Sequence, residues 1–138
     1  MRIADRGGSH FTIRRIGVDS GHHVHAKVHA AGFGFSGANE SVWFHRANID
    51  AFLRDLRRLD TTREGIATIE TMSPDECHLR IQNSDQLGHL YLDVLISRYL
   101  YFFGKSDRIY CRTRIDVDPT AFPQIVADLA EELVEFPA

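Results

Sequence analysis

The residues best suited to chemistry lie in the run from His22 to Ala30, where imidazoles alternate with small apolar side chains. Alternate residues of a β-strand point to the same face, so a strand here places His23, His25 and His29 on one side. His23 and His25 would then be about 6.6 Å apart, close enough to share a metal ion, whereas His29 lies about 13 Å beyond His25. The alternative is a polar face that contacts only water.

A metal site of this kind needs a third ligand from elsewhere in the chain. Candidates are His10, His78, His89 and Asp93. The His-x-His pair lacks the ligand spacing of a zinc signature. We therefore predict no bound metal and no cofactor, and we keep a metal site built on His23, His25 and His29 as the second interpretation.

A second cluster with chemical meaning is acidic and lies near the C-terminus. Its four carboxylates occupy positions i, i+3, i+4 and i+7, which form one stripe on a helix: Asp128, Glu131, Glu132 and Glu135. Like charges at these spacings destabilise a helix, which favours a basic protein partner that would compensate them. A solvated helix face is the alternative. We predict that this acidic stripe, a name kept below for these four residues, is the partner-binding site.

The sequence Gly32-Phe33-Gly34-Phe35 matches the centre of the RNA-recognition signature, in which strand aromatics stack on bases. Its flanks do not match, and the formal net charge of −3 disfavours a general nucleic-acid binder. We predict no nucleic-acid partner, and we interpret Phe33 and Phe35 as packing residues of a core strand bent by glycine.

No catalytic signature is present. The chain has no Gly-x-Ser-x-Gly elbow, phosphate-binding glycine loop or His-Glu-x-x-His motif. Cys77 and Cys111 occupy apolar positions of two predicted strands, where thiols are usually buried and reduced, although a disulfide between them stays open. We predict that the protein is not an enzyme.

The elements that must position these clusters follow from hydrophobic periodicity. Asn48 is the expected cap of the first helix, Thr120 that of the second, and Gly37-Ala38-Asn39 a turn. The expected strands cover residues 11–18, with a bulge near Ile16, and then 23–30, 41–45, 66–72, 77–82, 87–97 with an extension to 103, and 108–115. The expected helices cover residues 49–59 and 121–136.

This order, β-β-β-α-β-β-β-β-α, predicts an α+β domain spanning residues 1–138, with an ordered core at about 10–136. We expect a single, mostly antiparallel sheet of about six or seven strands. Both amphipathic helices would cover one of its faces. The bare face would be basic and aromatic, and would show His23, His25, Lys27, His29, His78, Arg80, Tyr110, Arg112 and Arg114. No apolar stretch approaches the roughly 20 residues that cross a bilayer, so we expect a cytoplasmic protein without a membrane partner.

The succession of motifs resembles a known family. An aromatic-glycine stretch over residues 32–37 is followed by Trp43 and Phe44, by Ile49-x-x-Phe52-x-x-x-Leu56, and then by Gly65-x-Ala67. A long strand, Gly88-x-Leu90-x-Leu92-x-Val94, precedes a closing strand that leads through Asp116 and Asp118 into a helix containing Phe122. From about residue 10 to 136 this pattern resembles the WapI-type immunity proteins.

The resemblance implies a cytosolic protein that binds a bacterial toxin, commonly a nuclease, without chemistry of its own. The matching residues are core and turn positions, so the family transfers no binding residue to this chain. The acidic stripe agrees with this expectation on physical grounds, because a nuclease site is basic and attracts a negative helix.

Overall fold

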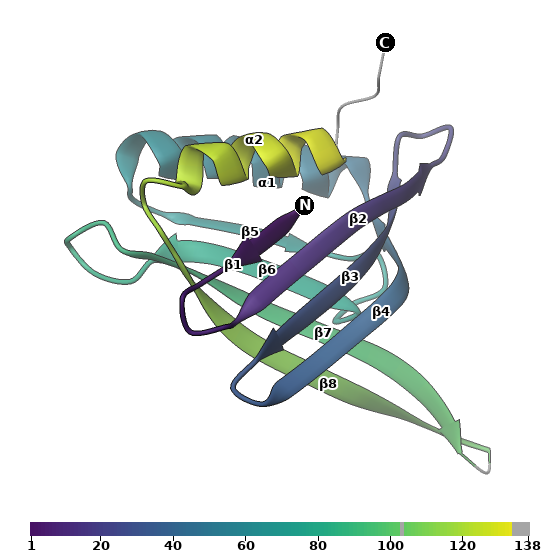
Figure 1. Cartoon of the computed structure of the whole chain (residues 1–138). Helices are drawn as coiled ribbons and strands as arrows, with labels where there is room; N and C mark the ends of the chain where they lie inside the picture. The colour runs from purple at the N-terminus through teal and green to yellow at the C-terminus, as the bar shows by residue number, and fades with distance from the viewer. Residues whose placement is uncertain (103, 134–138) are drawn as a thin grey trace.

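The structure, a computed structural model, describes residues 1–102 and 104–133. The side chain of Phe102, residue 103 and residues 134–138 lie outside the description. Figure 1 shows the arrangement of the elements, whose bounds are β1 Arg2–Ala4, β2 His10–Val18, β3 Val24–Gly32, β4 Phe35–Phe44, α1 Arg46–Thr62, β5 Ile66–Glu70, β6 Cys77–Asn83, β7 Leu90–Phe102, β8 Lys105–Val117 and α2 Phe122–Leu133.

The strands form two antiparallel four-stranded sheets rather than one. Sheet A has the order β1-β2-β3-β4 and sheet B the order β5-β6-β7-β8. The α+β class is therefore as predicted, whereas the single sheet of six or seven strands is wrong. Alternation shows which side of a strand faces the core, but not whether strands separated by a helix pair with each other. Beyond α1 the chain begins a new sheet, and the Met72 N–H donates to the Trp43 carbonyl at 2.8 Å where the two sheets meet.

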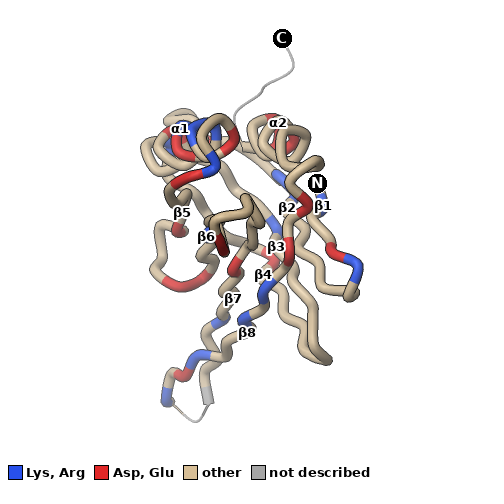
Figure 2. Tube along the Cα trace, turned by 90° about the vertical axis from the view of Figure 1, so that its left-hand side faces the viewer, with Lys and Arg blue, Asp and Glu red and all other residues tan. Residues whose placement is uncertain are grey.

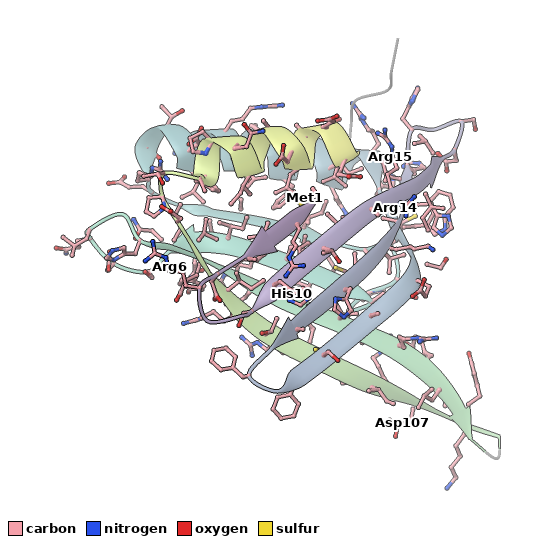
Figure 3. All side chains as sticks on the ribbon, in the orientation of Figure 1. Met1, Arg6, His10, Arg14, Arg15 and Asp107 are labelled. Carbon is pink, nitrogen blue, oxygen red and sulfur yellow. The ribbon has the colours of Figure 1, made fainter. Side chains whose placement is uncertain are left out.

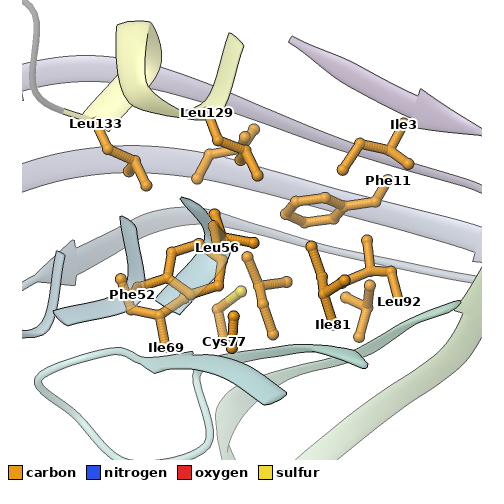
Figure 4. Close-up of a cluster of buried hydrophobic side chains, with 14 of the residues drawn as sticks. Ile3, Phe11, Phe52, Leu56, Ile69, Cys77, Ile81, Leu92, Leu129 and Leu133 are labelled. Atoms are coloured by element: carbon orange, nitrogen blue, oxygen red, sulfur yellow. The ribbon is translucent and has the colours of Figure 1, made fainter. Parts of the chain in front are cut away.

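The inner faces of the two sheets and the apolar faces of both helices enclose one core (Figure 4). Phe11 of sheet A, Phe52 of α1, Ile81 of sheet B and Leu129 of α2 are all buried in it. The alternation of the His-rich strand is confirmed, since its apolar side chains are buried: Val24, Ala26, Val28 and Ala30. Polar residues between them face outward because strand side chains alternate.

The two helices lie side by side across the same end of the sheets, instead of on one face of a single sheet (Figure 1). α1 packs on β5, α2 packs on β2, and the helices contact each other. α1 begins earlier than Asn48 predicts, because His45 Nδ1 accepts a hydrogen bond from the Ala47 N–H at 3.1 Å and caps the helix. α2 begins at Phe122, and Pro123 lies in its first turn as predicted, where no intrahelical bond is lost.

The hairpin between β3 and β4 turns at Phe33-Gly34, not at residues 37–39. Phe33 has a φ of 55° and Gly34 a φ of 81°, the positive values of a type I′ turn. Phe33 is 80% exposed and Phe35 is 72% exposed, so the prediction that they pack in the core is wrong. The glycines at positions 32 and 37 are instead explained by close packing against sheet B.

Glycine lets the β3–β4 hairpin approach sheet B closely. A Cβ atom at Gly37 would lie 2.4 Å from Cys111 Cβ, and one at Gly32 would lie 2.5 Å from Thr113 Oγ1. Real Cβ atoms do not come so close to other atoms, so these two residues must be glycine for the hairpin to cross β8.

The longest pairing joins β7 and β8. Their register is continuous from Leu90 opposite Val117 to Phe102 opposite Lys105, and this hairpin extends beyond sheet A (Figure 1). The bulge predicted near Ile16 is confirmed by a register shift between Arg15 and Gly17. β1, which the sequence did not predict, pairs with β2. Within residues 1–102 and 104–133, none of the helices has the length and apolar content of a membrane span.

Candidate partner-binding site

Three residues of the acidic stripe lie on α2, but their environments differ: Asp128, Glu131 and Glu132. Glu131 is exposed, and Asp128 Oδ1 accepts a hydrogen bond at 2.8 Å from the Gln124 side chain one turn earlier. Glu132 is directed toward sheet A and its side chain is only 26% exposed. Glu135 lies outside the described residues. The structure therefore exposes Glu131, leaves Asp128 half-buried and holds Glu132 against the body of the protein.

Glu132 joins α2 to the first strands of sheet A. Its Oε1 lies 3.0 Å from the amino group of Met1, and its Oε2 accepts a hydrogen bond of 3.0 Å from the Arg15 backbone N–H. The Arg15 guanidinium also donates to the Glu131 carbonyl at 3.3 Å. Figure 3 labels Met1, which directly precedes β1, and Arg15 on β2.

These contacts shift the acidity of Glu132. Partial burial of the carboxyl acts to raise its pKa, but the hydrogen bond from Arg15 and the Met1 ammonium outweigh burial and hold the pKa below its ordinary value. A carboxylate fixed in this way contributes to the fold and is less available to a partner.

The histidines do not converge on one point. His23 Nδ1 accepts a hydrogen bond of 2.9 Å from the Arg46 N–H, and its ring centre lies 4.3 Å from that of His45. His25 stacks on Trp43 with ring centres 4.6 Å apart, and its Nε2 lies 2.8 Å from Ser41 Oγ.

His29 has a third environment, stacked on His10 with ring centres 5.3 Å apart. Figure 3 labels His10 on β2. Among residues 1–102 and 104–133, no three His, Cys, Asp or Glu side chains lie close enough together to hold a metal ion. The structure thus brings no third ligand to His23 and His25, and it separates His29 from both.

The expected basic and aromatic face is divided between two sheets. His25, Lys27 and His29 lie on β3, whereas His78 and Arg80 lie on β6. Of the remaining members, His23 directly precedes β3 and three lie on β8: Tyr110, Arg112 and Arg114. The basic residues of sheet B therefore form a separate outer surface, and Figure 2 shows Lys and Arg residues along β7 and β8.

Two arginines of sheet B pack on aromatic rings. The Arg114 guanidinium carbon lies 3.9 Å from the ring centre of Tyr91, and Arg114 Nε lies 3.4 Å from Asp93 Oδ1. Arg108 lies 4.2 Å above the Tyr99 ring. Sequence reasoning placed Arg112 and Arg114 on an outer face but missed these pairs, since they depend on the register of β7 with β8.

Two hollows mark the surface. One of about 610 Å³ lies over sheet A and is lined by Arg14, Lys27, His29 and Glu132 among others. A larger one of about 1150 Å³ is lined by the β1–β2 turn, Phe33 and the end of β8. Figure 3 labels Arg14 on β2 and Arg6 at the β1–β2 turn. In the described part of the chain, neither hollow is lined by histidines placed to hold a metal ion.

The two cysteines are free thiols. Cys77 and Cys111 both lie opposite Ile96 of β7, on its two sides. Because β7 lies between them, the Cα atoms of the two cysteines are two strand spacings apart, about 9.6 Å. This is more than the Cα separation that a disulfide spans. Burial raises the pKa of both thiols, so neither is prepared to act as a nucleophile.

Comparison with known proteins identifies the family. No curated protein and no solved structure matches the sequence. The Immunity protein WapI-like family, in contrast, matches residues 2–137, which is nearly the whole sequence. The match begins at β1 and includes both sheets and both helices. The chain therefore belongs to the WapI-like family of immunity proteins.

Proposed function

We propose that this protein binds a cognate bacterial toxin in the cytosol and blocks it by direct contact. The observation that carries the proposal is the family match over residues 2–137. As a member of an immunity protein family the chain is not an enzyme, so protection has to come from occupying the toxin. A nuclease is the toxin class whose basic active site best suits a negative partner.

The acidic stripe on α2 is the candidate contact surface. Glu131 supplies an exposed carboxylate and Asp128 a half-buried one, while Glu132 also holds α2 to sheet A. Charges of this kind steer association and make it sensitive to ionic strength. Glu135 completes the stripe by its spacing in the sequence. The four residues together remain our proposed toxin-binding site.

The experiment takes its candidate toxins from the genes that neighbour the one encoding this protein, where the proposal predicts the toxin to be encoded. Co-expression of the immunity protein should rescue growth, and the purified pair should bind more weakly as salt rises. Asp128→Asn with Glu131→Gln should slow association with the toxin several-fold without altering the fold. Glu64→Gln with Glu76→Gln removes the same charge away from α2 and serves as the matched control.

Two results would contradict the proposal at different levels. Failure of the wild-type protein to rescue growth or to bind would remove the toxin-binding function. Unchanged binding of the Asp128 and Glu131 variant would retain that function but remove the α2 surface from it. Glu132 is left intact in this variant because its loss would also disturb the fold.

A further inference from the structure

The outer edge of β8 presents backbone groups that none of the described strands uses. The Asp116 N–H points away from β7, because it donates to Asp5 Oδ2 at 3.2 Å. Successive N–H groups of a strand alternate in direction, and the β7–β8 register is unbroken. The N–H and C=O groups of Tyr110, Arg112 and Arg114 therefore point away from β7 as well.

The pairing on the other side of β7 supports this assignment. Ser97 lies opposite Tyr110, and its N–H donates to the Glu76 carbonyl at 3.1 Å, on the side of β6. Within the part of the chain that the structure describes, no residue pairs with the outward backbone groups of Tyr110, Arg112 and Arg114. From Tyr110 to Arg114 this edge is about 14 Å long at about 3.4 Å per residue.

The outer face beside this edge is positively charged. Arg112 and Arg114 are exposed there, opposite Leu95 and Asp93 of β7. Tyr110, 55% exposed, precedes them on the same face. Directly opposed side chains on neighbouring strands interact, and opposite charges stabilise the pair. A strand added here would therefore place acidic side chains next to Arg112 and Arg114.

The inner side of the same edge is aromatic. Gly37 lies against Cys111 of β8, and Phe35, two residues earlier, points to the same side of its strand. The turn at Phe33-Gly34 passes beyond β8 on the side away from β7 (Figure 1). Phe33 and Phe35 thus extend over the position that an added strand would occupy. The large hollow, which Phe33 and Asp116 help to line, continues this surface.

We propose that the edge of β8 from Tyr110 to Arg114 binds an extended segment of a partner protein as an additional strand. Its outward side chains are acidic and face Arg112 and Arg114, and its inward side chains are apolar and face Phe33 and Phe35. Main-chain hydrogen bonds supply the attachment, and alternate side chains supply the specificity. Identifying this partner with the toxin rests on the proposed function, but strand addition itself is independent of it.

Charge argues against two other occupants. A second copy paired through β8 would bring Arg112 and Arg114 close to the same arginines, and like charges in such positions destabilise pairing. Nucleic acid would meet Asp93 and Asp116 on the same surface, and the whole chain has a formal charge of −3.

The experiment measures backbone amide exchange by NMR in the full-length protein. The probe is a terminally blocked peptide in which glutamate and valine alternate. Its addition should slow exchange at Tyr110, Arg112 and Arg114 by about tenfold or more, while amides already bonded to β7 stay unchanged. A peptide with lysine in place of glutamate is the matched probe and should protect none of them.

Variants separate the contribution of the arginine charges to peptide binding from that of the outward backbone N–H groups. Arg112→Glu with Arg114→Glu should weaken binding of the glutamate peptide about tenfold, whereas Arg57→Glu with Arg58→Glu on α1 should leave it unchanged. Arg112→Pro removes an outward N–H without breaking a β7–β8 hydrogen bond, so the fold should persist while protection is lost. Arg112→Gln is its control.

Several outcomes would overturn the proposal. One is unchanged exchange at the three amides with the peptide present up to its solubility limit. Protection that rises with protein concentration alone would assign the edge to a second copy, and protection by an oligonucleotide would assign it to nucleic acid. Failure of the wild-type protein to bind or neutralise the toxin would leave the peptide result unaffected, so the two proposals can fail separately.

Discussion

Glu132 and Arg15 are 117 residues apart in the sequence, yet Glu132 Oε2 accepts a hydrogen bond of 3.0 Å from the Arg15 backbone N–H. The bond ties α2 to β2 close to the bulge between Arg15 and Gly17. The Ile13 N–H donates to the Met1 carbonyl on the β1 side of β2. The Arg15 N–H, two residues further on, faces the same side beyond the end of β1, where the Glu132 side chain accepts from it. The last helix is thereby attached to the first sheet by a polar contact as well as by the core.

Removing this acceptor should destabilise the protein. Glu132→Ala leaves the partly buried Arg15 N–H without its partner, and we expect a loss of about 1–3 kcal/mol in the free energy of unfolding. Urea denaturation measures the change. Glu131→Ala, one residue earlier and exposed, should stay within about 0.5 kcal/mol of wild type. Equal effects of the two substitutions would show that the Glu132 contacts are not stabilising.

The same carboxylate should make stability depend on pH. Its pKa is lower in the folded protein than in the unfolded chain, so its contribution is fully present above the unfolded pKa. That contribution disappears as pH falls through the folded pKa. The difference in unfolding free energy between wild type and Glu132→Gln should therefore shrink below about pH 4.3. Denaturation curves between neutral and acidic pH test this, and a constant difference would contradict it.

Gly37 should tolerate no side chain. Gly37→Ala places a Cβ 2.4 Å from Cys111 Cβ, which cannot move without shifting β8. We expect a loss of about 1–3 kcal/mol, as in overpacked cores. A Cβ at Gly17 would meet nothing within 4 Å, so Gly17→Ala is the control and should cost much less.

A second substitution can test the cause of that loss. Cys111→Gly removes the opposing Cβ, so the double variant with Gly37→Ala should recover part of the stability lost by Gly37→Ala alone. Strictly additive losses in chemical denaturation would show that the two atoms do not collide.

Phe33 occupies a turn position that suits asparagine better. At a φ of 55°, Asn is more easily accommodated than Phe in a type I′ turn. Phe33→Asn should raise the free energy of unfolding by up to about 1 kcal/mol, because no buried contact is lost. Gly34→Ala, at a φ of 81°, should lower it. Thermal unfolding of both variants provides the measurement, and a clear destabilisation by Phe33→Asn would contradict this assignment.

Local periodicity predicted the parts of the fold that depend on near neighbours. The inward positions from Val24 to Ala30 and the buried face of α1 from Ile49 to Leu59 follow from spacings of two and of three or four residues. The bulge after Arg15 was visible because the apolar alternation changes parity there. Each of these features is decided within a few residues of the chain.

The features that sequence reasoning missed depend on distant segments. The division into two sheets depends on whether β4 pairs with β5 after α1, which neither strand encodes alone. The turn at Phe33-Gly34 was missed because Gly37-Ala38-Asn39 is a stronger local turn signal, although Gly37 is needed for contact with Cys111. Within the acidic stripe, nothing local marks Glu132 as the member that faces β2.

The alternation on both sheets also separates two sets of residues by how freely they can change. Substitution at an inward position such as Val28 or Ile81 disturbs packing shared by both sheets and both helices. Substitution at an outward position such as Arg112 or Lys27 costs little folding free energy. The outward half of each strand can therefore vary while the scaffold stays the same.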